Sequence, residues 1–432
     1  MAPARATARR APLARPDRRS SNRGTLLTTI RTRRWADRLG DVRPFRLGVG
    51  ALSEFPVKIW ARLSRRYWSH LDVAAIDYDE VAGYAPLRTA IAAYLQSARG
   101  VACEASQVII VNGSQQALDL ASRVLLDPGD VVWCEDPGYD GARGAFLGAG
   151  ARVVPVPVDR NGLNVAYATR RHPGARLAYV TPSHQFPSGV TMSLGRRLEL
   201  LRWARRSSAW IFEDDYDSEF RYSLRPLPAL QGLDADGCVI YSGSFSKVLF
   251  PALRLGYLVV PPSILDTFLR ARFLADVHPS TITQAILAEF IDGGHFERHV
   301  RRMRTLYRER QEALVSAASL HLAELLQVQA ARGGMHLTGW LPPGVDDRLA
   351  TRAARAEGVV VAPLSFFAQV RRRRGALLLG YAGLSPEQIA SGTKRLAKAL
   401  ETLARKSVDS PRTHFHDRSQ KTCRKNEEGS AP

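Results

Sequence analysis

Residues 239–247 read Val-Ile-Tyr-Ser-Gly-Ser-Phe-Ser-Lys, an apolar run that ends in small hydroxyl residues and is followed at once by Lys247. The apolar part predicts a short buried strand. A lysine at a buried strand end has the lowered pKa that imine chemistry requires, and small residues let backbone amides approach an anion. Arg254, seven residues on, suits a bidentate phosphate clamp. Ser-x-Ser-Lys alone more often gives a surface lysine, but the strand and the arginine together favour a ligand site.

Short apolar runs alternate with helical patterns around this stretch, which predicts an α/β fold with a mostly parallel sheet covered on both faces. Such a sheet binds ligands beyond the carboxyl ends of its strands. A long helical stretch at 264–318 then leads to a smaller α/β part at about 320–404. We expect strands at 108–111, 131–134, 152–156, 177–181, 209–213 and 239–242, and helices at 55–68, 87–99, 115–126 and 193–206.

A block of carboxylates follows the predicted strand 209–213, in the sequence Glu-Asp-Asp-Tyr-Asp at 213–217. Paired carboxylates suit a metal site or acid–base chemistry, and most such runs are acidic helix caps. A third interpretation is that one buried aspartate keeps the pyridine nitrogen of pyridoxal 5′-phosphate (PLP) protonated, which makes the ring an electron sink. A nearby tyrosine would then reach the ring hydroxyl.

Two further segments lie at predicted strand ends. Asn-Gly-Ser-Gln-Gln at 112–116 opens a helix whose first amides are unpaired, which makes an anion site or, more simply, a helix start capped by Ser114. Glu-Asp-Pro-Gly-Tyr at 135–139 ends in a tyrosine that can stack on a planar ring or pack as a turn residue.

Composition is that of a globular protein, with 432 residues, 45% hydrophobic and 24% charged. No apolar run approaches the ~20 residues of a membrane span, and the arginine-rich start at 1–19 lacks the apolar core of a secretory signal. The four cysteines form no Cys-x-x-Cys pair, so a cytoplasmic, reduced protein without a metal site is expected. The net charge of +20 suits a nucleic-acid partner, or reflects basic tails and solvated arginine-rich helix faces.

Taken together and in this order, the segments resemble the fold-type I PLP-dependent transferases of the aminotransferase class I/II superfamily. They are similar in particular to the aminotransferase-like domain of MocR-type regulators in the GntR family. The similarity covers about residues 45–403 and includes Gly-Tyr-Ala-Pro-Leu-Arg at 83–88, Thr-Pro-Ser-His-Gln-Phe-Pro-Ser-Gly at 181–189, and Glu-Asp-Asp-Tyr-Asp-Ser-Glu-Phe-Arg-Tyr at 213–222.

The resemblance implies a role for each matching residue. Lys247 would form the Schiff base with PLP, Asp214 would pair with the pyridine nitrogen, and Tyr216 would face the ring oxygen; these are the expected catalytic residues. Tyr139 would stack on the ring. The expected phosphate ligands are Ser114, Gln115, Ser244, Ser246 and Arg254. Tyr78 matches a tyrosine that reaches the partner subunit's phosphate, which implies a homodimer with shared active sites.

Two positions depart from the aminotransferase pattern. Phe186 stands where an asparagine usually precedes Pro-Thr-Gly, so His184 or Gln185 is expected to contribute to the ring-oxygen contact. Leu378 stands where an arginine usually binds the substrate α-carboxylate, and leucine cannot do so. The arginines at 371–374 lie upstream on a loop. Ordinary amino-acid transamination is therefore in doubt, and recognition of a different amine gains weight.

A third departure concerns DNA binding. MocR-type regulators carry an N-terminal winged helix-turn-helix of ~60–70 residues, whereas the forty or so residues before the PLP domain here lack the apolar pattern of that domain. We expect a disordered basic arm at 1–42, a PLP-binding domain at 43–404 with a large part at about 75–300 and a small part at about 320–404, and a disordered tail at 405–432. A DNA partner is expected only if a winged-helix domain is missing from this chain.

Two functions share these motifs. The favoured hypothesis is a PLP-dependent aminotransferase that acts on the amino group of a small amine or amino acid through the Lys247 Schiff base. The alternative is a PLP- and amine-sensing domain of a MocR/GntR-type transcriptional regulator that lacks its DNA-binding domain. The motifs do not separate the two, because both functions need the same cofactor site.

Overall fold

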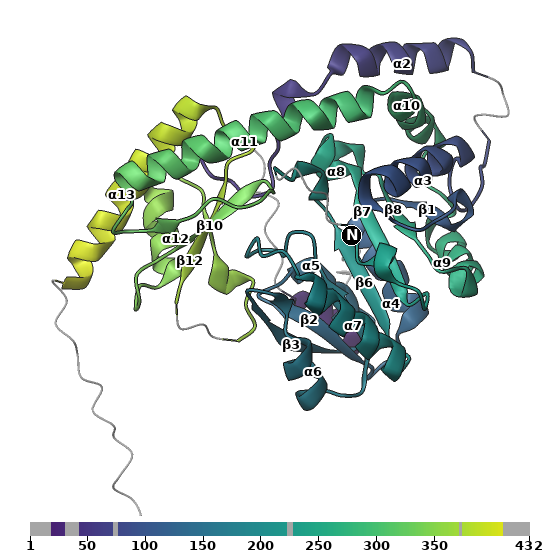
Figure 1. Ribbon diagram of the computed structural model, residues 1–432, viewed down its shortest axis with the longest axis horizontal. Helices are drawn as coiled ribbons and strands as arrows, with labels where there is room; N and C mark the ends of the chain where they lie inside the picture. Colours follow the sequence, from purple (N-terminus) through teal and green to yellow (C-terminus); the bar gives the residue numbers. More distant parts are fainter. Residues whose placement is uncertain (1–18, 31–42, 72–76, 223–227, 371–373, 409–432) are drawn as a thin grey trace, which may run out of the picture.

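The computed structural model describes residues 19–30, 43–71, 77–222, 228–370 and 374–408. They form a large lobe around one sheet and a smaller lobe around a second sheet (Figure 1). The long helix α11 (His295–His321) runs along both lobes and joins them.

The large sheet has eight strands in the order β1-β8-β7-β6-β5-β2-β3-β4. Strands β7, β6, β5, β2 and β3 are parallel, whereas β8 runs antiparallel to both β7 and β1. The expected mostly parallel α/β sheet is therefore confirmed. The strands span Val108–Val111 (β1), Val131–Asp136 (β2), Arg152–Asp159 (β3), Gly162–Leu163 (β4), Ala175–Val180 (β5), Trp210–Asp215 (β6), Val239–Ser244 (β7) and Gly256–Val259 (β8).

Alternation along each strand sends side chains to both faces of this sheet, so both faces are apolar. In β1, for example, Ile109 and Val111 pack under α4 (Ser114–Leu125), α5 (Asp140–Gly148) and α9 (Leu265–Asp276). Val108 and Ile110 face the opposite side, toward α3 (Ala85–Arg99). On that side α6 (Val165–Arg171) and α7 (Leu194–Ser207) cover β2, β3, β5 and β6.

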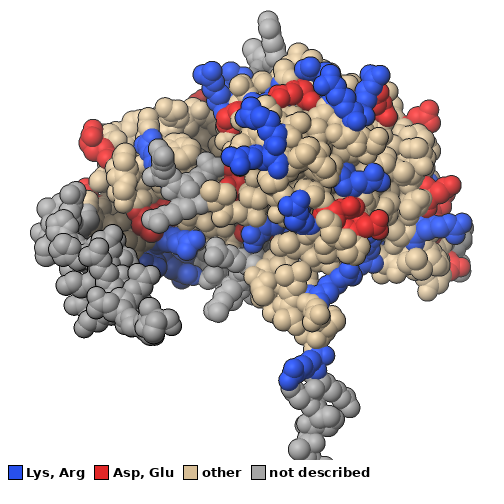
Figure 2. Space-filling view, turned by 90° about the horizontal axis from the view of Figure 1, so that it is seen from below, with Lys and Arg blue, Asp and Glu red and all other residues tan. Residues whose placement is uncertain are grey.

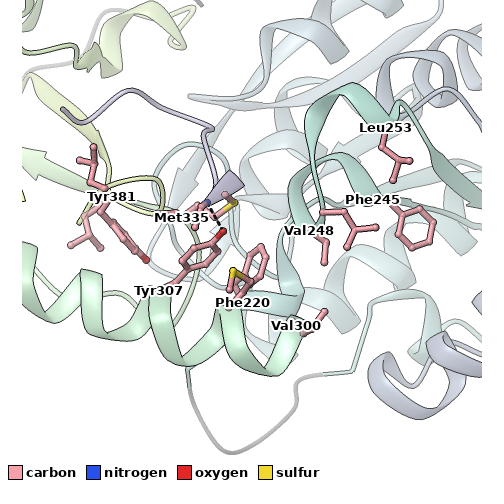
Figure 3. Packing of buried hydrophobic residues seen from close by; sticks show 14 of the residues in the cluster. Phe220, Phe245, Val248, Leu253, Val300, Tyr307, Met335 and Tyr381 are labelled. Atoms are coloured by element: carbon pink, nitrogen blue, oxygen red, sulfur yellow. Dashed lines mark hydrogen bonds between the residues drawn. The ribbon is translucent and has the colours of Figure 1, made fainter. Parts of the chain in front are cut away.

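The small lobe has an antiparallel sheet of order β11-β12-β10-β9, formed by Gln327–Val328 (β9), His336–Trp340 (β10), Ala362–Pro363 (β11) and Ala376–Gly380 (β12). Helices α12 (Asp347–Ala356) and α13 (Pro386–Val408) pack beside it. Figure 3 shows how α11 carries Val300 and Tyr307 into the core that joins the lobes, with Phe220 from the large lobe and Met335 from the small one. The Tyr307 hydroxyl accepts a hydrogen bond from Ala51 N at 3.0 Å.

The remaining helices cover the edges. Helix α2 (Val57–Ser69) lies on α10 (Thr281–Asp292), and α8 (Phe245–Val248) follows β7. Short 3-10 turns span Leu52–Glu54, Ala105–Gln107, Ser218–Phe220, Gln231–Leu233, Pro251–Leu253, Pro262–Ile264 and Leu364–Phe366.

Two predicted helical segments differ from the structure in their bounds. In the basic arm, where a short helix was expected near residues 26–39, helix α1 spans Asn22–Thr29, is capped by Ser21 and packs on α5, and residues 31–42 lie outside the described residues. The single long helical stretch at 264–318 is three helices, because Val277 adopts a positive φ of 61° and Gly294 one of 64°. Helical hydrogen bonding cannot continue through either conformation.

Charges on the described surface are mixed in sign. Figure 2 shows lysine and arginine side chains interspersed with aspartate and glutamate on the face it presents, so this face carries no continuous basic strip. Within the described ranges no helix combines the length and the apolarity that crossing a bilayer demands.

The junction of β7, β8 and the turn after β1 permits no side chain at Gly256. A Cβ there would lie 2.8 Å from the Gly243 carbonyl oxygen and 3.0 Å from Gly113 Cα. We predict that Gly256→Ala lowers the free energy of unfolding by roughly 1–3 kcal/mol, because backbone must move. Chemical denaturation measures this. Gly174→Ala is the control, since a Cβ at Gly174 meets nothing within 4 Å. An equal effect of both substitutions would contradict the packing argument.

Candidate cofactor site

Parallel strands bring the predicted site segments to one edge of the large sheet. Asp214 in β6 pairs with Ser242 in β7, and Lys247 follows three residues after β7 ends at Ser244. The turn after β1 and the turn after β2 deliver residues 112–116 and 137–139 to the same edge. Residues far apart in the sequence thus meet where such sheets bind ligands.

Asp214 is buried, and only one of its carboxylate oxygens has a protein partner. Its Oδ2 accepts a hydrogen bond from the Tyr179 hydroxyl at 2.8 Å, while its buried Oδ1 has no partner among the described residues. Burial raises the pKa of Asp214 to about 7, with Asp215 and Asp217 acting in the same direction and the Tyr179 hydrogen bond and Lys247 opposing. A carboxylate in this state is suited to a cationic N–H partner at Oδ1.

The neighbouring carboxylates of the acidic block are bound within the protein. Asp215 pairs with Arg99 at 2.9 Å and accepts from the Tyr241 hydroxyl at 2.6 Å. Burial opposes the charge on Asp215, but Arg99 and these hydrogen bonds hold its pKa below the ordinary value. Glu213 accepts from the amides of Leu230 and Gln231, both at 2.8 Å. Among the described residues no cluster of acids, histidines and cysteines is suited to a metal ion. The interpretations of the acidic block at 213–217 as a metal site or as a helix cap gain no support.

Lys247 lies in α8, next to the N-terminal segment that crosses from the small lobe. Its Nζ is 3.5 Å from the Gly48 carbonyl oxygen, and a Cβ on Gly48 would lie 3.1 Å from Nζ. Gly48 has a φ of +80°, so both its backbone conformation and the close approach of the lysine favour glycine here.

An anion cradle lies between the start of α4 and Arg254. Gly113, with a φ of +92°, precedes α4, and no side chain caps this helix, so the proposed Ser114 cap was wrong. Ser114 is instead the first helical residue, where backbone amides are unpaired. The Arg254 guanidinium donates to Asn112 O at 2.8 Å and would lie 3.7 Å from a Cβ on Gly113. Unpaired amides, the helix dipole and a guanidinium together suit a phosphate.

The hydroxyl residues before Lys247 differ in their bonding. Ser244 Oγ accepts from Ser246 N at 3.2 Å and so caps α8, whereas Ser246 Oγ is buried without a hydrogen-bond partner among the described residues. Gln115 donates to Gly141 O at 3.0 Å and accepts from the Tyr139 hydroxyl at 3.4 Å. The Tyr139 ring thereby lies over the start of α4, 6.0 Å from the Phe186 ring.

Asp276 is a contributor that sequence reasoning missed. Its Oδ2 accepts from the side-chain amides of Asn112 and Gln116, both at 2.9 Å, and it also pairs with the buried Arg272. The turn after β1 is therefore fixed from one side by Arg254 and from the other by the end of α9. Nothing in the sequence near residue 112 indicates a partner more than 160 residues away.

Gln185, in the segment 181–189, makes contacts other than the expected one with the cofactor's ring oxygen. Its amide donates to Glu135 Oε2 at 3.1 Å and to Pro137 O at 2.9 Å, and its Oε1 accepts from Ser188 N. Gln185 therefore ties its own loop to the end of β2 and the turn that follows. The Phe186 ring lies edge-on to Tyr216 at 6.0 Å, and His184 Nδ1 lies 3.1 Å from the Tyr216 hydroxyl. Burial, followed by Asp217 and Asp214, raises the pKa of Tyr216, so its phenol stays neutral.

The small lobe presents an apolar wall at Leu378. This residue is fully buried in β12, in a cluster whose other members are Leu47, Phe186, Trp340, Ala362, Leu364, Phe366, Phe367 and Ala376. Arg374 is directed elsewhere, donating to Leu341 O and Gln327 Oε1. Residues 371–373, also considered as carboxylate ligands, lie outside the described residues.

The wall is fastened to the large lobe beside Tyr139. Asp136 accepts from Gln369 N at 2.7 Å, and Gly138 N donates to Phe367 O at 3.0 Å. The Phe367 ring then meets Phe186 edge-on at 5.1 Å. These two bonds, one from a main-chain amide to a buried carboxylate and one between main-chain groups, hold the two lobes together at the mouth of the site.

Tyr78 is not brought into this set within the chain. Its side chain is 82% exposed, and its ring lies 6.0 Å from that of His278.

At the carboxyl edge of the sheet lie a lysine, an anion cradle and a buried aspartate, one of whose oxygens has no partner among the described residues. This arrangement is characteristic of the PLP-dependent transferases of fold type I. The chain belongs to the aminotransferase class I and II family, whose pattern matches residues 44–396. Members of this family use PLP.

Three relatives illustrate the membership. The chain is 45% identical to the probable rhizopine catabolism regulatory protein MocR of Rhizobium meliloti, over 83% of this chain and 72% of that protein. It is 34% identical to a 2-aminoadipate transaminase of Thermus thermophilus, over 82% of this chain and 89% of that one. The structure of the α-aminoadipate aminotransferase LysN from Thermus thermophilus, complexed with N-(5′-phosphopyridoxyl)-L-leucine, superposes with a TM-score of 0.81 at 32% identity, covering 88% of this chain and 98% of that one.

The described residues fit PLP on their own geometry. Asp214 Oδ1 is a buried acceptor without a partner among them, as a protonated ring nitrogen requires, and Ser246 Oγ is a buried hydroxyl in the same condition. Gly113 leaves room beside Arg254 that a Cβ would fill.

The raised pKa of Asp214 makes stability depend on pH in the cofactor-free protein. Because the folded pKa, about 7, lies above the ordinary 3.8, the folded state binds the proton more tightly and stability falls as pH rises between these values. We predict that Asp214→Asn removes at most about 4 kcal/mol of this fall. Thermal melts of wild type and variant between pH 4 and 8 measure it. Parallel curves for both proteins would contradict the assignment.

Proposed function

We propose that residues 43–404 form a PLP-binding unit in which Lys247 Nζ bonds covalently to the cofactor and Asp214 Oδ1 accepts from its ring nitrogen. Tyr216 donates to the ring oxygen, and Tyr139 stacks on the ring. The proposed phosphate ligands are the residues around the start of α4 and before Lys247: Ser114, Gln115, Ser244, Ser246 and Arg254. The observation that carries this proposal is the buried Asp214 oxygen without a partner among the described residues.

The chemistry divides between cofactor and protein. When bound, PLP supplies an electron sink for the carbon that carries the substrate amino group. Asp214 keeps the ring nitrogen protonated, which that sink requires, and Tyr179 orients its carboxylate. Once the substrate amine has replaced Lys247 Nζ at the cofactor, the freed Nζ would take the proton from the substrate carbon that carries the nitrogen and return it to the carbon on the other side of that nitrogen, as general base and then general acid. The apolar wall around Leu378 and Phe186 excludes water from the reacting atoms.

We propose that the substrate is a small amine and that the chain transfers its amino group. Relatives named as transaminases, such as the 2-aminoadipate enzyme, support transfer. The fully buried Leu378 stands where the resemblance to aminotransferases places the arginine that binds an α-carboxylate, so an amine without an α-carboxylate fits better than an α-amino acid.

A second candidate function is amine sensing by a MocR/GntR-type regulator. Relatives named as a regulatory protein and a transcriptional regulator, at 45% and 36% identity, favour it. In this role the same site would bind PLP and an amine. Binding would then alter the contact that Asp136 makes between the two lobes. Amine transfer with repeated turnover supports the enzyme, and a single half-reaction or binding alone supports the sensor.

We further propose a homodimer in which Tyr78 of one subunit reaches the phosphate of the other. The exposed phenol of Tyr78, fixed near His278 at the surface, supports this arrangement.

Lys247→Ala is expected to abolish the visible absorbance band of the purified protein, because no other described residue would hold the cofactor covalently at this strand end. Absorbance after incubation with PLP and dialysis measures it. Lys398→Ala, which removes an exposed lysine of α13 paired with Glu357, is the control and should keep the band. A yellow Lys247→Ala protein after dialysis would contradict the proposal.

The choice of amine is tested by half-transamination. With stoichiometric PLP and no acceptor, we predict that primary amines lacking an α-carboxylate yield pyridoxamine phosphate at least about tenfold faster than α-amino acids of the same carbon skeleton, the effect of one unpaired buried charge. Chromatography of the released cofactor measures both rates. Faster conversion of the α-amino acids would show that another group binds their carboxylate.

A further inference from the structure

Two buried side chains, His184 and Asp217, and the partly buried Tyr216 form a chain of contacts beside the proposed cofactor ring. His184 Nδ1 lies 3.0 Å from Asp217 Oδ2 and 3.1 Å from the Tyr216 hydroxyl. The side chains of His184 and Asp217 are 7% and 1% exposed. The sequence places these residues on two different loops, so the fold alone brings them together.

The direction of these hydrogen bonds follows from elementary chemistry. An ionised Asp217 can only accept, so the proton between the two residues belongs to His184 Nδ1. The Tyr216 oxygen, which faces the same N–H, must then act as an acceptor toward it. The phenol proton of Tyr216 is consequently not used by His184 and points to another group.

The other nitrogen of His184 is enclosed by backbone. A Cβ on Gly189 would lie 3.2 Å from Nε2, and one on Gly334 would lie 2.6 Å from it. Nε2 is buried and has no hydrogen-bond partner among the described residues. The two glycines thus hold the ring in one orientation, and neither nitrogen of His184 is directed at a cofactor held by Asp214 and Lys247.

The charged and titratable groups around this chain of contacts are few. His336 in β10 lies 5.3 Å from the His184 ring, and Arg221 and Arg332 line the small hollow beside it, with room of about 10 Å³. On the other side burial favours the neutral form of Tyr216, and Asp217, Asp214, Glu135 and Asp215 act in the same direction. A neutral phenol is what a donor requires.

We propose that His184, held by Asp217, is a positioning residue that turns the hydroxyl proton of Tyr216 toward the ring oxygen of the cofactor. His184 then acts through Tyr216, where the sequence suggested a direct contact. The inference rests on the proposed function, because it needs Tyr216 to serve the cofactor.

The test compares variants by PLP affinity and by the visible band of the bound protein. Tyr216→Phe, His184→Leu and Asp217→Ala should each weaken PLP binding by about tenfold, the loss of one strong hydrogen bond, and shift the band in the same direction. His184→Asn should stay within about twofold of wild type, because the asparagine amide restores a donor near the Nδ1 position. Tyr216→Phe/His184→Leu should bind no more weakly than Tyr216→Phe alone.

The outcomes that would overturn the inference can be distinguished from one another. If the losses of PLP affinity in the double variant were additive, His184 would not act through Tyr216. Wild-type PLP affinity in His184→Leu and Asp217→Ala, together with weakened affinity in Tyr216→Phe, would have the same meaning. Either result would remove the positioning role and leave the proposed function standing. Wild-type affinity in Tyr216→Phe would remove the Tyr216 contact itself. Melting curves of the cofactor-free variants exclude unfolding as the cause.

A second readout needs no cofactor. In nitrogen-15 histidine NMR of the cofactor-free protein, His184 should carry its proton at Nδ1, and the signal is assigned by its loss in His184→Asn. Asp217→Ala should shift the proton to Nε2. A bare Nδ1 in the wild-type protein would contradict the proposal regardless of what PLP does.

Discussion

The site depends on a buried carboxylate with one unused oxygen. An aspartate removed from water is expensive to ionise unless its oxygens find partners, and among the described residues Asp214 has a protein donor at Oδ2 only. Its neighbour Asp215 is compensated by Arg99, Tyr241 and Ser218. Asp215 Oδ1 is likewise buried without a partner among the described residues, but the paired Arg99 neutralises the charge of this acid. Asp214 lies next to it on the opposite face of the sheet and has no such ion pair among the described residues, so it is the one of the two that is suited to a cationic ring.

The rest of the fold keeps that acid at a fixed position relative to an anion cradle. Pairing of β6 with β7 fixes Asp214 against the strand that leads to Lys247, and the close packing of Gly256 on Gly113 sets the start of α4 beside Arg254. The small lobe closes the site with Phe367 through the bonds of Asp136 and Gly138. Rigid elements therefore carry the polar groups, and an apolar wall keeps their surroundings dry.

The sequence predicted the sheet and the residues at strand ends, because parallel strands have a fixed direction and short apolar runs such as β1 mark them clearly. It missed contacts that depend on tertiary packing. Tyr179 reaches Asp214 from the neighbouring strand, and Asp276 reaches Asn112 from the end of α9. It joined α9, α10 and α11 into one helix, since a positive φ at Val277 leaves no compositional trace. Ser114 was taken as a cap because its type suits that role, whereas Gly113 occupies the position.

The protonation state of the cofactor's ring nitrogen in the protein tests the role of Asp214 most directly. Nitrogen-15 NMR of the chain loaded with ring-labelled PLP reports it as a chemical shift. We predict a protonated nitrogen at neutral pH in the wild-type protein and a deprotonated one in Asp214→Ala. A deprotonated nitrogen in the wild-type protein, or the same shift in both proteins, would contradict the pairing on which the site is built.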